Sequence, residues 1–481
     1  MSRIRVFLCL LLVSAFVFGG VGMGEALGSR SQLTFFESSR DLLGVGLRGR
    51  ALSQLRLLGV RALRVELAWY DVAPGRGGAR RPVFDASNPA AYDWGKYDPL
   101  LLAAKRLGWP VLLTVTSPVP RWATSNRRAP YITRPGDLDF QRFMTAVGRH
   151  FGSMVAFYSI WNEPNHPAFL LPQFASNGLP ASPRIYRGLF QAGYAGLQAA
   201  GIASPRVLMG ETAPTGYDSV SPREGRGALL HDVAPLAFLR GALCLNARYQ
   251  KSGSCGSLPA FGYAHHAYTK ATGPLYSPPG ADNVTIGVLP RLTRALDLAA
   301  RAHAIPGGLP VYLTEFGIQS KPNRFLGVPV DQQAEFDAIA ERIAYSNPRV
   351  AAFSQYLLRD DPLGGQSQVS AHGGFIGFQT GLEYLSGKPK PLYFAWPVPL
   401  TVSKRGRGFS LWGLVRPTAT TTKVTILVQA QHQRGYHTLK TVTTDSHGYW
   451  TLYSTTPAEH WRVRWKSPTG TKYEGPPIRA Y

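Results

Sequence analysis

The sequence predicts an α/β protein, a (β/α)8 barrel followed by a small all-β sandwich domain. The chain has 481 residues, which is room for one barrel-sized domain and a smaller one. Between residues 29 and 399, short apolar runs alternate with amphipathic helical stretches, as in repeated βα units. Beyond residue 399 only short strand-like runs with Gly and Pro turns remain. We therefore divide the chain into a leader of residues 1–28, a barrel of residues 29–399 and a sandwich of residues 400–481.

Eight segments of the larger domain have the character of buried parallel strands. They are short apolar runs, and most are rich in β-branched or aromatic residues. A doubly wound sheet has the same alternation of strands and helices and is the alternative fold. The predicted strands are Leu33–Glu37, Ala62–Trp69, Val111–Thr116, Ala156–Trp161, Val207–Gly210, Phe261–His265, Val311–Glu315 and Ala352–Leu357.

Helical stretches lie between these strands. Asp137 opens one in which apolar residues recur every three or four positions, and it ends near Gly152. Another begins at Ser182, an expected N-cap with Pro183 at the first helical position, and continues to Gly201. The other predicted helices are Asp98–Leu107, Val233–Leu243, Leu289–His303 and Asp331–Tyr345.

The predicted sandwich consists of five short strand-like runs separated by turns. Its 82 residues carry 12 Lys and Arg against 3 Asp and Glu, a net charge of +9. Such a basic domain could bind an anionic cell-wall polymer or another polysaccharide, or it could be a solvated structural appendage. The predicted strands are Lys404–Gly413, Lys423–Gln431, His437–Thr443, Tyr449–Ser454 and Trp461–Trp465.

The first 28 residues have the features of a secretory signal peptide. Arg3 and Arg5 give it a positive start, and an apolar stretch of 18 residues follows from Val6 to Met23. Small residues then allow cleavage after Ala26 or Gly28. An uncleaved membrane anchor is the alternative, because 18 residues is near the lower limit for crossing a bilayer. We expect the protein to be secreted.

Two cysteines remain after the leader, Cys244 and Cys255. Eleven positions apart in an exported protein, they predict one disulfide. Two thiols alone do not make a metal site, and we predict no metal and no cofactor. The sequence also lacks the Gly-x-Ser-x-Gly and His-Glu-x-x-His motifs of common serine hydrolases and zinc proteases.

The whole chain is basic, with 52 Lys and Arg against 28 Asp and Glu and a net charge of +24. Only 12 of the 52 are Lys, and an Arg preference of this kind often reflects a biased genome. The charge alone therefore identifies no partner. Export argues against nucleic acid as a partner, and we predict no stable protein partner.

Two predicted strands end in a carboxylate. Glu163 follows the fourth strand and Glu315 ends the seventh. A carboxylate at the end of an apolar strand is costly unless it is paired or used, and barrels place their working residues at these ends. Three strands apart around one barrel, the two would face each other across its mouth. Glycoside hydrolysis needs such a pair, one acid to protonate the leaving oxygen and one carboxylate to attack or to activate water.

The motifs around these carboxylates carry a family resemblance. Trp161-Asn162-Glu163-Pro164 and Thr314-Glu315-Phe316-Gly317 resemble the acid/base and nucleophile motifs of retaining glycoside hydrolases of clan A. These are cellulase-type TIM barrels, and families five and thirty-nine of that classification are the most similar. The resemblance implies that Glu163 is the general acid/base and Glu315 the nucleophile. It also implies a carbohydrate substrate.

The same resemblance assigns roles around the pair. Asn162 would hold the sugar 2-hydroxyl, and Arg64 on the second strand would keep Glu315 ionised. His266 and Tyr268 match the His-x-Tyr of the sixth strand in the clan, where the Tyr is expected to hydrogen-bond the nucleophile. His265 and His266 alternate faces in a strand, so at least one of them is expected to be structural. The basic tail resembles immunoglobulin-like domains appended to secreted enzymes.

Some positions depart from the clan pattern. Many members have a sugar-stacking Trp on the eighth strand, where this chain has Tyr356 as the expected substitute. The fifth strand adds a carboxylate, Glu211, to which the resemblance gives no role. Glu66 shares strand parity with Arg64, so the two could instead form a buried ion pair. Trp122, after the third strand, is expected to stack on a sugar, with loop packing as the alternative.

The expected function is that of a secreted retaining β-glycosidase that hydrolyses O-glycosidic bonds of a poly- or oligosaccharide by double displacement. Two alternatives remain open at this point. One is a transglycosylase that uses the same two glutamates. The other is a catalytically inactive protein that binds a polysaccharide or the cell wall.

Overall fold

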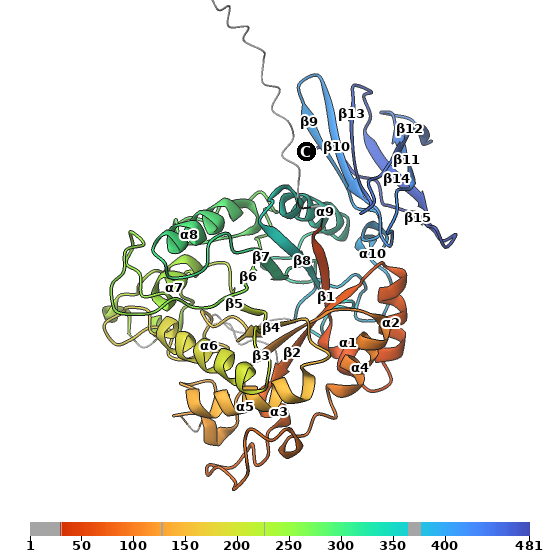
Figure 1. The fold of residues 1–481 in the computed structure, drawn as a ribbon. Helices are drawn as coiled ribbons and strands as arrows, with labels where there is room; N and C mark the ends of the chain where they lie inside the picture. Colours follow the sequence, from red (N-terminus) through yellow and green to blue (C-terminus); the bar gives the residue numbers. More distant parts are fainter. Residues whose placement is uncertain (1–28, 30, 127, 226, 364–376) are drawn as a thin grey trace, which may run out of the picture.

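The larger domain is a closed parallel barrel. The computed structural model describes residues 29, 31–126, 128–225, 227–363 and 377–481, and the predicted signal peptide of residues 1–28 lies outside them. Each of the strands β1 to β8 pairs in parallel with the next, and β8 pairs with β1. Helices surround the barrel (Figure 1). The predicted (β/α)8 barrel is confirmed, and the doubly wound alternative is wrong because the sheet closes on itself.

The eight predicted strands are confirmed to within two residues at either end. Their apolar character follows from burial on both faces, since β3 and β5 have no exposed residue. The strands are β1 (Leu33–Glu37), β2 (Ala62–Ala68), β3 (Val111–Thr116), β4 (Phe157–Ile160), β5 (Val207–Thr212), β6 (Gly262–His266), β7 (Val311–Glu315) and β8 (Val350–Tyr356).

The six predicted helices are confirmed as α4 to α9. Residue 182 is the first residue of α6 rather than its N-cap, which is Ala181. Four further α-helices among the described residues were not predicted: α1, α3 and α10 have only four or five residues, and α2 buries only Ala51 and Leu55. The helices are α1 (Ser39–Leu43), α2 (Arg48–Leu57), α3 (Trp69–Val72), α4 (Asp98–Leu107), α5 (Asp137–Phe151), α6 (Ser182–Ala199), α7 (Pro235–Ala242), α8 (Leu289–Arg301), α9 (Val330–Ser346) and α10 (Pro391–Ala395).

The inside of the barrel is filled in two layers of opposite polarity. Near the start of the strands, one side chain from each strand joins an apolar cluster: Phe35, Ala62, Leu112, Phe157, Leu208, Ala264, Tyr312 and Ala352. Side chains in a strand return to the same face every second residue. Two residues further on, the strands carry Glu37, Arg64, Thr114, Ser159, Gly210, His266, Thr314 and Ser354. This second layer is polar, and it lies toward the carboxyl ends of the strands.

The second domain consists of two antiparallel sheets, with strand orders β13-β10-β9 and β12-β11-β14-β15. One hydrophobic core that includes Trp450, Trp461 and Trp465 joins them, which makes the domain a β-sandwich. Its likeness to immunoglobulin-like domains stays a prediction. The strands are β9 (Leu400–Arg405), β10 (Gly408–Leu414), β11 (Lys423–Gln429), β12 (His437–Thr443), β13 (Tyr449–Ser454), β14 (His460–Lys466) and β15 (Lys472–Glu474).

One strand prediction in this domain is wrong. The run 404–413 is not a single strand, because the chain reverses at Gly406 and Arg407 to form the hairpin of β9 and β10. Gly406 has φ of +57°, the left-handed backbone that a two-residue hairpin turn requires. The four-residue alternation of Arg and Gly around the turn hid the break in the pattern.

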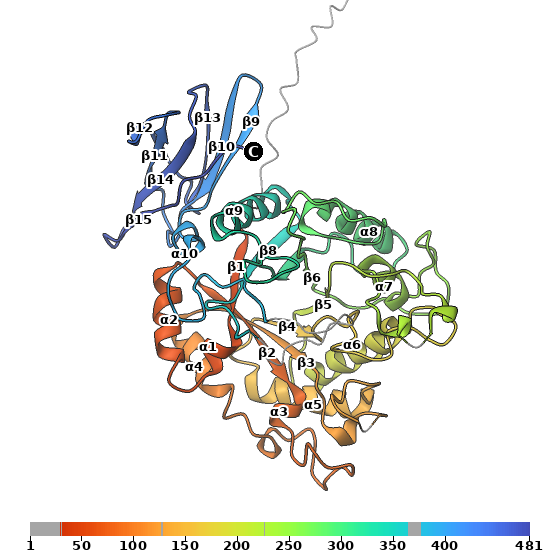
Figure 2. The same ribbon diagram turned by 180° about the vertical axis from the view of Figure 1, so that it is seen from behind.

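The two domains pack together through α9 of the barrel (Figure 2). Arg416 of the sandwich donates to Glu341 of α9 at 2.5 and 3.0 Å, and both side chains are buried. Beside this pair, Tyr345 of α9 packs against Trp412 and Tyr449. A buried, hydrogen-bonded ion pair and an aromatic cluster at one junction favour a fixed arrangement of the domains.

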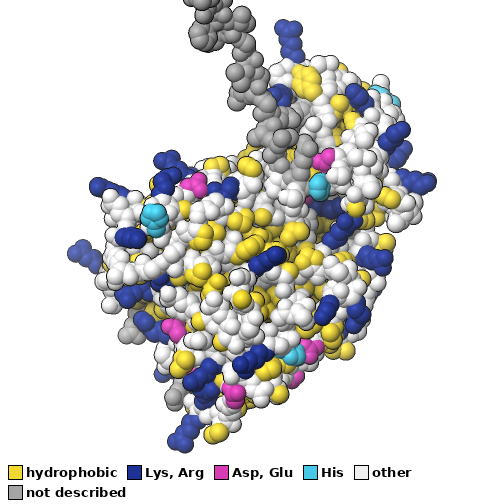
Figure 3. Space-filling view, viewed as in Figure 1, with side chains coloured by type: hydrophobic (Ala, Val, Ile, Leu, Met, Phe, Trp, Pro, Cys, Tyr) yellow, Lys and Arg dark blue, Asp and Glu magenta, His cyan; other side chains and the backbone are white. Residues whose placement is uncertain are grey.

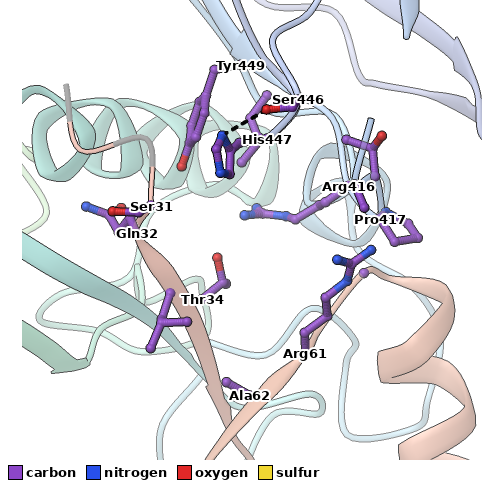
Figure 4. A pocket seen from close by; sticks show the side chains of 15 residues that line it. Ser31, Gln32, Thr34, Arg61, Ala62, Arg416, Pro417, Ser446, His447 and Tyr449 are labelled. Carbon is purple, nitrogen blue, oxygen red and sulfur yellow. Dashed lines mark hydrogen bonds between the residues drawn. The ribbon is translucent and has the colours of Figure 1, made fainter. Parts of the chain in front are cut away.

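A pocket of about 440 Å³ lies at this junction (Figure 4). Arg61, Arg416 and His447 line it together with residues at the start of β1 and β2. It therefore lies at the opposite end of the barrel from the carboxylates predicted to be functional.

The two cysteines predicted to pair do so. Cys244 and Cys255 form a disulfide between α7 and β6, with a Cα–Cα distance of 6.1 Å. The part of the chain that the structure describes contains no helix with the length and hydropathy to cross a bilayer. The alternative of an uncleaved membrane anchor concerns residues 1–28, which lie outside that part.

Candidate active site

The two predicted catalytic carboxylates come together at His266, a member of the polar layer inside the barrel. Glu315 is the last residue of β7 and is paired in register with His266 of β6. Glu163 lies three residues beyond β4. Nδ1 of His266 lies 2.9 Å from Oε1 of Glu163 and 3.7 Å from Oε2 of Glu315. Two carboxylates from distant parts of the chain thus meet at one imidazole nitrogen.

The backbone at the end of β4 is bent sharply to present Glu163. Trp161 and Glu163 have φ of +71° and +35°, in the left-handed region that non-glycine residues rarely adopt. The surrounding strands hold this conformation. The carbonyl oxygen of Val115 accepts from the backbone N–H of Trp161 at 2.9 Å, and the backbone carbonyl oxygen of Glu211 accepts from the backbone N–H of Glu163 at 3.0 Å. Strained backbone of this kind costs about 1–3 kcal/mol per residue and is typical of functional sites.

Glu315 accepts two hydrogen bonds that favour its ionised form. Arg64 donates to Oε2 at 3.1 Å, and the Tyr268 hydroxyl donates to Oε1 at 2.7 Å. Hydrogen bonds from a hydroxyl and from a charged guanidinium stabilise the anionic form of a carboxyl group. This is the environment that a nucleophilic carboxylate needs, and it brings together three residues that the sequence assigned to one site.

Arg64 is the centre of a buried network that joins five strands or strand ends. From β2 it donates to Glu37 at the end of β1, to Asn162 after β4 at 2.8 Å and to Glu211 of β5 at 3.3 and 2.8 Å. It also donates to Glu315 of β7, so the guanidinium contacts strands on different sides of the barrel interior. The pair with Glu66, which was the alternative role for Arg64, is present beside these contacts, at the longer distance of 3.4 Å.

Burial dominates the protonation of the two carboxyl groups. It raises the pKa of Glu163 to about 7 and the pKa of Glu315 to about 8, although the charge of Arg64 opposes both shifts. Because the two groups lie so close, they titrate as a pair that shares one proton near neutral pH. The higher pKa of Glu315 would place this proton on Glu315, but the hydrogen bonds from Arg64 and Tyr268 to its two oxygens stabilise its ionised form. We therefore assign the negative charge to Glu315 and the proton to Glu163.

His266 is a neutral partner of this pair. Burial, followed by the charge of Arg64, lowers its pKa to about 3. A neutral imidazole can donate from Nδ1 to an ionised Glu163 or accept the proton of the acid form. It therefore suits a residue that alternates between acid and base. His265 is structural, as expected for one of the two, because its nitrogens lie 2.9 Å from Oγ1 of Thr212 and 2.8 Å from the carbonyl oxygen of Val284.

Asn162 is oriented by its neighbours. Its backbone N–H donates to Oγ1 of Thr116 at 3.0 Å, and its Oδ1 accepts from Arg64. Since Arg64 can only donate, Oδ1 is fixed as the oxygen, and the amide N–H groups of Asn162 remain for another acceptor. This arrangement suits the expected contact with a sugar hydroxyl, which stays a prediction.

Tyr356 ends β8 and pairs in register with Glu37. Its ring lies edge-on to Phe378, with centroids 5.1 Å apart, and Phe378 also packs against Tyr268. Burial and then the charge of Glu315 raise the pKa of Tyr356. An aromatic side chain therefore stands near the carboxylate at the strand where the sequence predicts a sugar platform.

Trp122 is not placed as expected. It is buried in the hydrophobic core, with 9% of its surface exposed, and packs edge-on against Trp69 and Phe84. Its indole N–H donates to the carbonyl oxygen of Pro74 at 3.2 Å. Stacking on a sugar needs an open ring face, which this packing does not leave. The alternative, that Trp122 packs against its own protein rather than against a sugar, therefore holds.

The sequence reasoning missed Glu37 as part of the site. This carboxylate is buried at the end of β1, and burial, opposed by Arg64, raises its pKa well above the usual range. It also missed Thr114, whose hydroxyl donates to Glu211 at 2.9 Å. The sequence did contain a signal for both residues. Counted along their own strands, they fall on the face that points into the barrel, as Arg64 does in β2.

Comparisons with known proteins support the fold. No protein-family model matches the sequence, and a search of curated proteins finds no match. Among solved structures, a glucosidase from Croceicoccus marinus aligns with a TM-score of 0.51 at 11% identity, over 90% of this chain and 95% of that one. A calcium-binding mutant of β-glucuronidase 2 from Bacteroides uniformis aligns with a TM-score of 0.46 at 10% identity, over 94% of this chain and 45% of that one. Xylanase 10B from Thermotoga petrophila aligns with a TM-score of 0.43 at 13% identity, over 76% of this chain and 91% of that one.

The protein is therefore a (β/α)8 barrel with a C-terminal β-sandwich, and its barrel mouth holds two buried glutamates at the ends of β4 and β7. At 11% identity the likeness to the glucosidase concerns the fold, and what the site does must be argued from the site itself.

Proposed function

We propose that this protein is a glycoside hydrolase that acts with retention of configuration, with Glu315 as nucleophile and Glu163 as acid/base. The observation that carries the proposal is the pair of glutamates around Nδ1 of His266. Their nearest oxygens can be no further apart than the sum of the two distances to that nitrogen. In retaining enzymes the two carboxyl groups are ~5–5.5 Å apart, which lies within this limit. In inverting enzymes they are ~6.5–9.5 Å apart, and the limit allows only the shortest of these separations.

The contacts of each glutamate fit its step. Glu315, held by Arg64 and Tyr268, attacks the anomeric carbon, and the protonated Glu163 gives its proton to the leaving oxygen. Glu163 is then the base that takes a proton from water, which releases the sugar from Glu315. His266 follows the protonation state of Glu163 through the hydrogen bond between Nδ1 and Oε1 at 2.9 Å.

The proposal is tested with a panel of β-linked polysaccharides, including cell-wall and capsular extracts. We expect wild-type protein to release reducing ends from at least one polymer and the E315Q variant to release none. Proton NMR of the first product should show the anomeric configuration of the substrate. Folded wild-type protein that releases nothing from any polymer, or a product of inverted configuration, would contradict the proposal.

Replacement of Glu163 with Ala should affect substrates according to their leaving groups. Without an acid, a poor leaving group departs without a proton, so kcat for alkyl or sugar leaving groups should fall ~10²–10⁴-fold. Activated aryl glycosides, whose phenolate needs little help, should lose far less in the first step. The check is a comparison of kcat/KM for the two kinds of substrate. Equal losses on both would exclude Glu163 as the acid.

The pH dependence should reflect the raised pKa values of the pair. Activity needs Glu163 protonated and Glu315 ionised, so kcat/KM should be bell-shaped. Because burial raises the pKa of both carboxyl groups, both limbs should lie above the usual carboxyl range. The pKa of Glu163 is raised to about 7, so its acid form persists to neutral pH and the alkaline limb should lie at or above pH 7. In E163Q this limb should disappear for activated substrates. An alkaline limb below pH 6 in the wild type would contradict the assignment.

We further propose that the protein is secreted, on the basis of its leader sequence. Binding of an anionic wall polymer by the sandwich domain is a second proposal, which rests on the domain's net charge of +9. Figure 3 shows Lys and Arg side chains spread over this face of both domains rather than gathered in one patch. The spread fits a solvated basic surface as well as it fits a polymer site.

A further inference from the structure

We propose that the sugar bound beside the two catalytic glutamates carries a positive charge, as an unacetylated amino sugar does, that Glu66 recognises it, and that uronic acids are excluded. This inference rests on the proposed glycoside hydrolase function and names its substrate class. It follows from the charges at the mouth of the barrel and from the partners they have already taken.

Among the described residues, Arg64 is the guanidinium that contacts the site carboxylates, and it has no donor left for a sugar carboxylate. Nε of Arg64 donates to Glu211, one terminal nitrogen donates to Glu37 and Glu315, and the other donates to Asn162, Glu211 and Glu66. Arginine has five N–H groups, and these six contacts use all of them. Recognition of a carboxylate by arginine needs two parallel N–H groups. Arg64 is therefore a structural centre and cannot bind a uronic acid.

In the part of the chain that the structure describes, the other cationic groups whose charge reaches Glu66 or the catalytic pair are paired or neutral. Lys96, whose charge reaches Glu66, donates to Asp71 at 2.5 Å. His166, whose charge reaches Glu163, lies 3.8 Å from Asp232. Burial keeps His266 neutral. The site thus has the positive charge of Arg64 and five carboxyl groups: Glu37, Glu66, Glu163, Glu211 and Glu315.

An excess of buried carboxyl groups is relieved either by protons or by a bound cation. Burial and mutual repulsion raise the pKa of Glu37, of Glu66 and of the catalytic pair, so part of the relief comes from protons in the free protein. An ammonium group placed among them would replace a proton, whereas a sugar carboxylate would add one more negative charge. The site thus discriminates between sugars by charge.

Glu66 is the carboxylate available to such a group. Its side chain is 29% exposed, against 0–10% for the other four. Two residues beyond Arg64 on β2, it lies on the same face of the strand. Its contact with Arg64, at 3.4 Å, is the longest of the six that Arg64 makes. A partly exposed carboxylate with one long hydrogen bond can accept a strong bond from an ammonium group.

The surface of the whole protein would give the opposite preference. With a net charge of +24, the chain attracts anions and repels cations at long range. A preference for a cationic sugar can therefore arise only from the local carboxylates, and it should grow when salt screens the surface charge.

The test uses six 4-nitrophenyl β-glycosides at pH 6: the neutral, 2-amino-2-deoxy and uronic acid forms of the gluco and the galacto sugar. We expect kcat/KM for the amino sugar to exceed that for the matching neutral sugar about tenfold, and the uronide to fall below the neutral sugar at least about 100-fold. In E66Q the tenfold preference should disappear, so that kcat/KM for the amino sugar no longer exceeds kcat/KM for the matching neutral sugar. E459Q, at an exposed site of the sandwich, is the matched control.

The same variants are compared in calorimetric binding of glucosamine, glucose and galacturonic acid tetramers. Tighter binding of the glucosamine tetramer that E66Q abolishes supports the inference even if no glycoside is turned over, in which case only the proposed function fails. Uronides that are bound or hydrolysed as well as neutral sugars would overturn the inference, whatever the activity. So would an amino-sugar preference that E66Q leaves unchanged.

Discussion

Replacement of Glu315 with Gln is expected to lower kcat by at least about 10⁴-fold without loss of the fold. An amide cannot attack the anomeric carbon, and loss of a nucleophile removes most of the catalysed rate. The fold should survive because Gln has the shape of Glu and its oxygen can still accept from Arg64 at 3.1 Å or from Tyr268 at 2.7 Å. The measurement is kcat on the best substrate of the panel, with thermal unfolding of the same sample.

The matched control for this variant is E459Q, which makes the same chemical change on an exposed side chain. It should leave kcat and the unfolding temperature as in the wild type. If E315Q retained wild-type turnover, the nucleophile would have to be another group. Rapid denaturation of E315Q would show instead that Glu315 is needed for the barrel, and the kinetic result would then be repeated with E315D.

Replacement of Arg64 with Met should give the largest loss of stability of any single change at the site. Arg64 is 1% exposed and compensates Glu37, Glu211 and Glu315 in the interior of the barrel. Removal of one partner of a buried ion pair leaves an unpaired charge and costs about 3–5 kcal/mol of unfolding free energy. We expect R64M to unfold at lower denaturant concentration by this amount and to lose activity as well.

Two further variants separate charge from position. R64K keeps the charge but has three donors in place of five, so it should recover part of the stability and little of the activity. R61M removes an exposed Arg just before the same strand and should change neither. Because protonation of the stranded carboxyl groups replaces the missing charge, the loss in R64M should shrink as the pH falls. An R64M protein as stable as R61M at pH 7 would show that the network contributes nothing to folding.

The sequence by itself determined the barrel and the identity of the carboxylates. Apolar runs such as Val111–Thr116 are buried on both faces, and that local pattern is enough to locate a strand. Strand order follows chain order in this fold, so the ends of β4 and β7 could be placed on one mouth before any contact was known. Glu163 and Glu315 were therefore predictable as neighbours.

Local patterns were insufficient in two other places. Trp122 follows a strand as a binding aromatic would, but only its packing against Trp69 and Phe84 shows it to be core. The hairpin at Gly406 depends on a positive φ that the surrounding residues do not signal, because the alternation continues through the turn. In both places the deciding property is a contact or a backbone angle that sequence spacing does not contain.

Only the tertiary structure decided the electrostatics of the site. The sequence shows Glu37, Arg64 and Glu211 on separate strands, and nothing local indicates that one guanidinium contacts all of them. Closure of the barrel brings these side chains into one small interior volume where water is excluded, so each carboxyl group affects the protonation of the others. Composition fixed which charges the chain has, while the fold decided which of them compensate one another and which remain for a ligand.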